Sequence, residues 1–232
     1  MRYIHIIMKS KLRHILLLML LLSPLVAAAQ AGIDVSRFQD TIRWKKVVQN
    51  KNLKFVYIKA SEGASIRDAM YRYNIRKARE AGLLVGSYHV YSSKSTAYDQ
   101  FRNFKTAVGK EKQDIVPVLD IEAVHCHKLN MKRVDKLLEL MENEYGVKPM
   151  IYTSEKLYHT HFHNSPKHRR YHFFIANYKR KPNMPYTVWQ YTQQGSVAGV
   201  RGPVDLSRFH PKYSIETIKI VKKKAVADTT AK

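Results

Sequence analysis

The sequence VPVLDIEA at residues 116–123 decides how the fold is interpreted, because it is typical of a buried strand that ends in two acids. Asp120 and Glu122 are separated by Ile121 alone. Side chains alternate between the two faces of a strand, so both carboxylates are predicted to lie on one side. Carboxylates that share a small volume repel, and one then keeps its proton while the other ionises. This pairing suits glycoside hydrolysis, although a solvated strand end would show the same short motif.

Strand and helix patterns alternate along the chain on both sides of this stretch. The strands are predicted at residues 32–36, 55–60, 83–91, 116–123 and 149–153. Between them, helices are predicted at 40–48, 67–81, 96–108 and 129–145, the first capped by Asp40 and Thr41. Three further strands are predicted at 173–177, 187–191 and 204–206, joined by segments too short or too rich in Gly and Pro for full helices.

This order predicts an α/β fold, a TIM-like barrel of eight strands in which five β/α units are followed by three strands with reduced or missing helices. Catalytic groups in such barrels lie at the carboxyl ends of the strands. Asp34 is predicted near the end of the first strand and Asp205 near the end of the eighth. The first and eighth strands are neighbours in a closed barrel, so these two acids should face Asp120 and Glu122 across the mouth.

The ends of the chain differ in composition from its middle. Residues 1–30 combine a basic start, an apolar run and a small-residue stretch, which predicts a secretory signal and export to the periplasm or the exterior. Residues 31–212 are predicted to form the catalytic barrel, and 213–232 a basic, partly disordered tail. An uncleaved membrane anchor is the alternative for the first segment.

The protein is strongly basic. Its 232 residues hold 41 Lys or Arg against 18 Asp or Glu, a formal charge of +23. Residues 1–29 contain four of these bases and no acid, so the remainder keeps a charge of +19. This excess favours an anionic partner such as an acidic cell-wall surface. A nucleic-acid binder is disfavoured by the export signal, by the acidic mouth and by the lack of a recognisable nucleic-acid motif.

Two groups of residues resemble metal or thiol sites but are better explained as loops. Cys126 lies between His125 and His127 and is the only cysteine, so no internal disulfide is possible. His159, His161 and His163 alternate in a segment that is predicted to be a solvated loop. We therefore expect neither a metal nor a cofactor.

Eight motifs in the same order resemble glycoside hydrolase family 25, the Chalaropsis-type lysozymes that cleave peptidoglycan. They are GIDVSRFQ at 32–39, FVYIKASEG at 55–63, AGLLVGSYHV at 81–90, PVLDIE at 117–122, PMIYTS at 149–154, IANY at 175–178, WQY at 189–191 and VDLS at 204–207. Val90 stands where the family commonly has Phe, and Ser207 where it commonly has Asn. These departures leave the acids intact.

The resemblance implies N-acetylmuramidase activity on the β-1,4 bond between N-acetylmuramic acid and N-acetylglucosamine. By position, Glu122 matches the proton donor, Asp120 its partner acid, and Asp34 and Asp205 the remaining acids of the site. The spacing of the acid pair leaves retaining and inverting mechanisms open. The resemblance favours a retaining route in which the substrate's own acetamido oxygen attacks while Asp120 orients that group.

Residues near the other strand ends are candidates for binding the sugar. Rings have flat apolar faces and a polar edge, so stacking on a sugar is expected, with packing in the core as the alternative. The substrate-binding candidates are Tyr88, Tyr152, Trp189, Lys59 and Gln190. We expect a monomer whose partner is the peptidoglycan polymer. A non-catalytic glycan-binding module on the same barrel is the alternative function.

Overall fold

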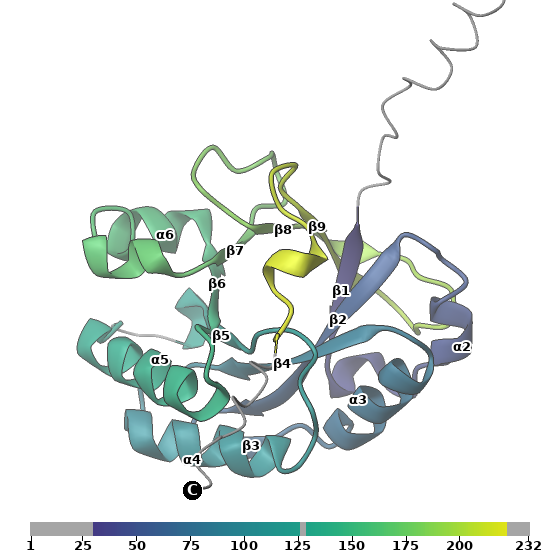
Figure 1. Ribbon diagram of the computed structural model, residues 1–232, viewed down its shortest axis with the longest axis horizontal. Helices are drawn as coiled ribbons and strands as arrows, with labels where there is room; N and C mark the ends of the chain where they lie inside the picture. The colour runs from purple at the N-terminus through teal and green to yellow at the C-terminus, as the bar shows by residue number, and fades with distance from the viewer. Residues whose placement is uncertain (1–29, 126–128, 222–232) are drawn as a thin grey trace, which may run out of the picture.

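The chain forms a closed barrel of eight strands with helices on its outer side (Figure 1). The computed structural model describes residues 30–125 and 129–221. In order around the ring, the strands are β1 (Ala31–Val35), β2 (Leu53–Glu62), β4 (Leu84–Val90), β5 (Val118–Ile121), β6 (Met150–Ser154), β7 (Phe173–Ala176), β8 (Val188–Gly195) and β9 (Val204–Phe209). The two-residue β3 (Ile66–Arg67) pairs with the end of β2 and stands outside this ring. The predicted TIM-like barrel is confirmed.

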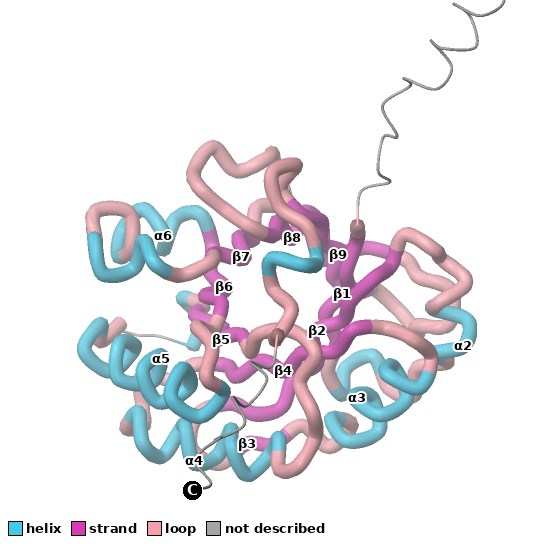
Figure 2. Tube along the Cα trace, viewed as in Figure 1, coloured by secondary structure: helices cyan, strands magenta, loops and turns pink. Residues whose placement is uncertain are grey.

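Helices follow the first five strands of the ring, as predicted. They are α2 (Trp44–Val47), α3 (Tyr71–Glu80), α4 (Ala97–Val108), α5 (Met131–Tyr145) and α6 (Glu155–His161). In Figure 2 they lie outside the ring of strands, whereas loops connect β7, β8 and β9. Four short 3-10 helices complete the described chain: η1 (Arg37–Gln39), η2 (Ala123–His125), η3 (Pro166–Arg170) and η4 (Ile215–Thr217).

Capping residues begin or end several helices where the sequence predicts, but one predicted cap is not found. The Thr96 and Asn130 side chains accept backbone N–H bonds at the starts of α4 and α5, and Gly146 ends α5 in the left-handed conformation. The predicted cap of the first helix is wrong. Arg43 holds that position without a side-chain hydrogen bond, while Asp40 adopts a φ of 52° immediately after η1.

The last strand runs in the opposite direction to its neighbours. β9 pairs antiparallel with both β8 and β1, whereas every other pair in the ring is parallel. Asp205 is therefore near the amino end of its strand, and its predicted place at a carboxyl end is wrong. It still reaches the mouth, because reversing a strand brings its amino end to that side, where Asp205 pairs directly with Asp34.

Strand alternation divides the apolar residues into two layers. Leu119 and Ile121 point outward into a core shared with the helices, whereas Val118 points inward into a second core that fills the lower barrel. Ile215 and Ile218, from the segment predicted as a tail, are buried in this inner core. Residues 222–232 of that segment, and residues 1–29, lie outside the described residues.

We predict that Ile218→Ala destabilises the protein by about 2–5 kcal/mol, because it removes a fully buried side chain and leaves a cavity in the inner core. Val221→Ala is the matched control, since Val221 is 78% exposed, and it should change the free energy of unfolding by less than about 0.5 kcal/mol. Urea denaturation of both variants measures the difference. Equal stability of the two variants would show that the segment after β9 does not stabilise the inner core.

Candidate active site

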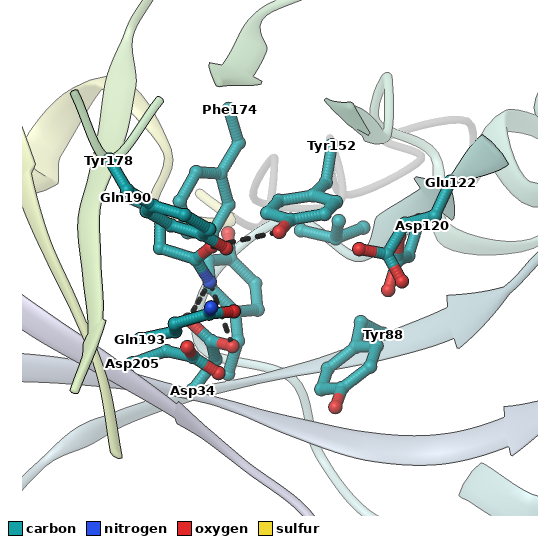
Figure 3. Close-up of a pocket in the computed structure, with 12 residues that line it drawn as sticks. Asp34, Tyr88, Asp120, Glu122, Tyr152, Phe174, Tyr178, Gln190, Gln193 and Asp205 are labelled. Carbon is teal, nitrogen blue, oxygen red and sulfur yellow. Dashed lines mark hydrogen bonds between the residues drawn. The ribbon is translucent and has the colours of Figure 1, made fainter. Parts of the chain in front are cut away.

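A pocket at the mouth of the barrel brings the four predicted acids together. It has a volume of about 160 Å³ and is lined by Asp34, Asp120, Glu122 and Asp205. Figure 3 shows Asp120 and Glu122 on one side of the pocket and Asp34 and Asp205 on the other. The two members of the D-I-E motif therefore share a face, as strand alternation predicts.

Asp34 and Asp205 form a carboxyl pair that Gln190 holds in place. Both oxygens of Asp34 accept hydrogen bonds from the Gln190 Nε2, at 3.2 and 3.0 Å. The pKa of Asp34 is raised well above its ordinary value by burial and then by the charge of Asp205. Burial also raises the pKa of Asp205, which a hydrogen bond with Asp34 partly offsets. The pair is thus suited to sharing one proton.

Asp120 has a buried carboxyl oxygen without a hydrogen-bond partner in the described part of the chain. It is buried, and its Oδ1 atom has no hydrogen-bond partner among the described residues. Burial raises its pKa well above the ordinary value, and the charges of Glu122 and Asp34 raise it further. A buried acceptor without a partner is unfavourable, so this oxygen is ready to accept a donor from a ligand.

Glu122 lies just after β5, where solvent and charged neighbours both reach it. Burial raises the pKa of Glu122, His125 opposes that shift, and Asp205 adds to it. The His125 Nε2 atom lies 3.7 Å from a Glu122 oxygen, and its Nδ1 atom lies 3.5 Å from Glu62. A half-buried carboxyl with a raised pKa keeps its proton to a higher pH than a free carboxyl does, and can donate it.

A groove continues from the acids over η1. Lys59 and Glu62 line it together with Arg37, Phe38 and His125. The Lys59 ammonium donates to Glu62 at 2.7 Å. Burial raises the pKa of Glu62, but the contact with Lys59 and the charges of His125 and Arg37 together lower it below the ordinary value. Lys59, a predicted binding residue, is thus beside the acids, but its charge is already paired.

Aromatic and amide side chains form the wall between the two acid pairs. The hydroxyls of Tyr152 and Tyr178 donate to the Gln190 Oε1 at 2.8 and 2.6 Å. Tyr88 also lines the pocket, opposite Tyr152 in Figure 3. The predicted residues Tyr88, Tyr152 and Gln190 therefore meet at the site.

Trp189 does not line this pocket. Because Gln190 points into the barrel, the preceding residue Trp189 points outward, where it is 7% exposed and packs in the outer core. Its indole N–H donates to the Asn177 carbonyl at 2.7 Å, and the Arg208 guanidinium lies 4.4 Å from its ring centre. The structure thus supports the core-packing interpretation of Trp189.

The structure adds Tyr178 and Gln193 to the pocket. Tyr178 follows the predicted sixth strand, so it could have been identified from the rule that functional groups of such barrels lie at the carboxyl ends of the strands. Gln193 had no such signal. The pairing of β8 with β9 shifts between Gln190 and Thr192, which indicates a bulge, and a bulge changes which later side chains face the barrel.

The histidines predicted to be in a loop are in part helical. His159 and His161 belong to α6, and His163 follows it. Within residues 30–125 and 129–221, no group of three or more His, Cys, Asp or Glu residues is arranged to hold a metal ion. Cys126 and His127 lie outside the described residues. None of the described helices is long and apolar enough to cross a membrane.

A closed barrel with several carboxyl groups of raised pKa at its mouth defines a glycoside hydrolase as the class of protein. The sequence model of glycosyl hydrolases family 25 matches residues 33–200. The chain therefore belongs to family 25 of the glycoside hydrolases.

Relatives and solved structures agree with this assignment. The chain is 36% identical over 190 residues to the uncharacterized protein YegX of Escherichia coli K12, covering 77% of this chain and 69% of that one. It is 27% identical over 208 residues to lysozyme M1 of Streptomyces globisporus, covering 82% and 70%. A family 25 glycosyl hydrolase from Bacillus anthracis superposes with a TM-score of 0.71 at 27% identity, covering 80% of this chain and 91% of that one.

We predict that Asp120→Asn stabilises the fold more at pH 7 than at pH 4. A raised pKa means that the folded state favours the protonated acid, so stability is lost as pH rises from about 3.9, the unfolded value, through the folded pKa. Asn cannot ionise and escapes this loss. A gain of about 1 kcal/mol would raise Tm by about 2–4 °C in thermal unfolding.

Asp40→Asn is the matched control, because the Asp40 side chain is exposed and its contact with Arg201 is long, at 3.8 Å. Its Tm should follow that of the unsubstituted protein at both pH values. A Tm gain for Asp120→Asn that is independent of pH would contradict the raised pKa.

Proposed function

We propose that this protein is an exported lysozyme that hydrolyses the β-1,4 bond between N-acetylmuramic acid and N-acetylglucosamine in peptidoglycan. Family membership supports the polymer and the reaction. The observation that carries the proposal is the contrast within one pocket between Glu122, a carboxyl placed to donate a proton, and Asp120, a buried carboxyl with a free oxygen.

In the proposed mechanism, Glu122 gives its proton to the glycosidic oxygen as the bond breaks. Positive charge develops at the anomeric carbon, and the acetamido oxygen of the substrate attacks that carbon. The acetamido N–H donates to the free Oδ1 of Asp120, which orients the group and stabilises its charge. Water then opens the intermediate while Glu122 acts as base, so configuration is retained.

In this proposal, the Asp34–Asp205 pair helps to position the side chains that line the pocket. Gln190 links Asp34 to Tyr152 and Tyr178, so the pair and the aromatic wall form one hydrogen-bonded unit. The excess of basic residues outside the mouth would draw the enzyme to an anionic wall surface, where it works as a monomer. Export rests on residues 1–29 and their signal-like composition.

We predict that Glu122→Gln lowers the rate of peptidoglycan clearing by about 10²–10⁴-fold, because Gln has nearly the same shape but cannot donate the proton. Loss of turbidity from purified peptidoglycan measures the rate. Glu139→Gln is the control, since Glu139 lies exposed on α5 with its salt bridge to Lys136, and it should clear at the original rate. If the unsubstituted protein is as inactive as Glu122→Gln, the non-catalytic binding module becomes the better assignment.

We predict further that the first anomer released has the β configuration of the substrate. Proton NMR of a soluble muramic acid oligosaccharide, followed during the first minutes before mutarotation, distinguishes the two anomers. Immediate formation of the α anomer would exclude both acetamido participation and a covalent route through Asp120, since each of them retains configuration.

A further inference from the structure

A second cavity lies on the outer wall of the barrel, apart from the acid pocket. It has a volume of about 440 Å³ and shares no lining residue with the pocket of the four acids. We call it the outer cavity and define it by Tyr158, Arg169, Phe173, Tyr186 and Tyr213. It lies where α6 meets β7, which are neighbours in Figure 1.

Strand alternation separates the two sites. Phe174 lines the acid pocket and the preceding residue, Phe173, lines the outer cavity, so β7 has one site on each face. His172 and Thr187, at the amino ends of β7 and β8, also line the outer cavity. The acid pocket is at the opposite end of these parallel strands. A ligand in the outer cavity therefore leaves the acids accessible.

The outer cavity lies where helices cover little of the barrel. α6 has seven residues, and no helix lies between β7 and β8. Aromatic rings cover the wall instead. Tyr158 and Phe173 meet edge to face at 4.9 Å, and the His210 ring lies 4.8 Å from Tyr186 and 5.9 Å from Tyr213.

These tyrosines keep their polar ends free. The hydroxyls of Tyr158, Tyr186 and Tyr213 make no hydrogen bond to another part of the described chain, whereas that of Tyr171 contacts Glu142. Tyr213 is also 40% exposed. Flat rings with free hydroxyls suit a sugar, which has apolar ring faces and hydroxyl edges.

The charge around the outer cavity is positive. No carboxylate lines it, and Arg170 is already paired with Glu142. Arg169 is exposed and forms no ion pair with the described residues. Further bases lie close by, because the charge of Lys148 adds to burial in lowering the pKa of His172, and Arg208 acts on Tyr186. A ligand here should carry negative charge.

We propose that the outer cavity is an accessory binding site for a carboxylate-bearing glycan, and that its occupant is an uncleaved strand of peptidoglycan. The identity of this occupant rests on the proposed function. Peptidoglycan has sugar rings that can stack on the tyrosines and carboxylates that can pair with Arg169. Because its glycan strands are cross-linked into a network, further strands lie beside the one being cut. Binding two strands at once increases retention on the polymer without changing the chemistry at the acids.

The test uses Glu122→Gln as the parent, so that the polymer stays intact, and measures pelleting with insoluble peptidoglycan. Adding Arg169→Gln or Tyr213→Leu should weaken the apparent affinity by about tenfold. Arg72→Gln is the matched control, because Arg72 is an exposed arginine on α3 with no ion pair to a described residue. It should bind as the parent does. Arg169 is exposed, so its replacement does not endanger folding.

The proposal is overturned if the parent is not retained, or if Arg169→Gln and Arg72→Gln bind equally. A second readout uses the same substitutions with Glu122 intact. Hydrolysis of a short soluble oligosaccharide should be unchanged, while clearing of whole peptidoglycan should slow severalfold. Failure of the unsubstituted protein to cut the oligosaccharide would refute the proposed function, and the pelleting result would still decide whether the outer cavity binds the polymer.

Discussion

The pairing of β1 with β9 is the constraint on which the site depends. It closes the barrel and sets Asp34 directly opposite Asp205, two like charges that only a shared proton and the Gln190 amide make compatible. Closure also brings this pair within reach of Asp120 and Glu122 across the mouth. Without it, Asp34 and Asp205 would not meet each other or face the Asp120–Glu122 pair.

Crowding of acids is unfavourable for the fold and useful for chemistry. Each raised pKa means that ionisation in the folded state is resisted, so the crowding that weakens the protein as pH rises also helps Glu122 to keep a proton that it can donate. The two ends of the barrel interior differ in polarity. The lower barrel is filled by apolar side chains such as Val118 and Ile218, and the mouth is left open and polar. The apolar side chains below the site therefore stabilise the fold, and the acids at the mouth supply the reactivity.

In the described chain, no helix lies between β7 and β8 or between β8 and β9, and this part of the barrel is irregular on both sides of the wall. Inside, β8 has a bulge beyond Gln190, and Gln193 lines the pocket there. Outside, aromatic rings take the place that a helix would fill, and this creates the outer cavity beside β7. The irregular third of the barrel thus contributes to the acid pocket and to the accessory site that we propose.

The sequence by itself determined the order of strands and helices, the shared face of Asp120 and Glu122, and the acids that would converge, because these depend on periodicity and on strand-end position. Only the tertiary structure decided the direction of β9, the outward orientation of Trp189 and the place of Gln193. Strand direction and register are set by pairing between distant segments, and a bulge changes which face a residue occupies without leaving a local signal. The free oxygen of Asp120 likewise follows from its surroundings and not from the motif.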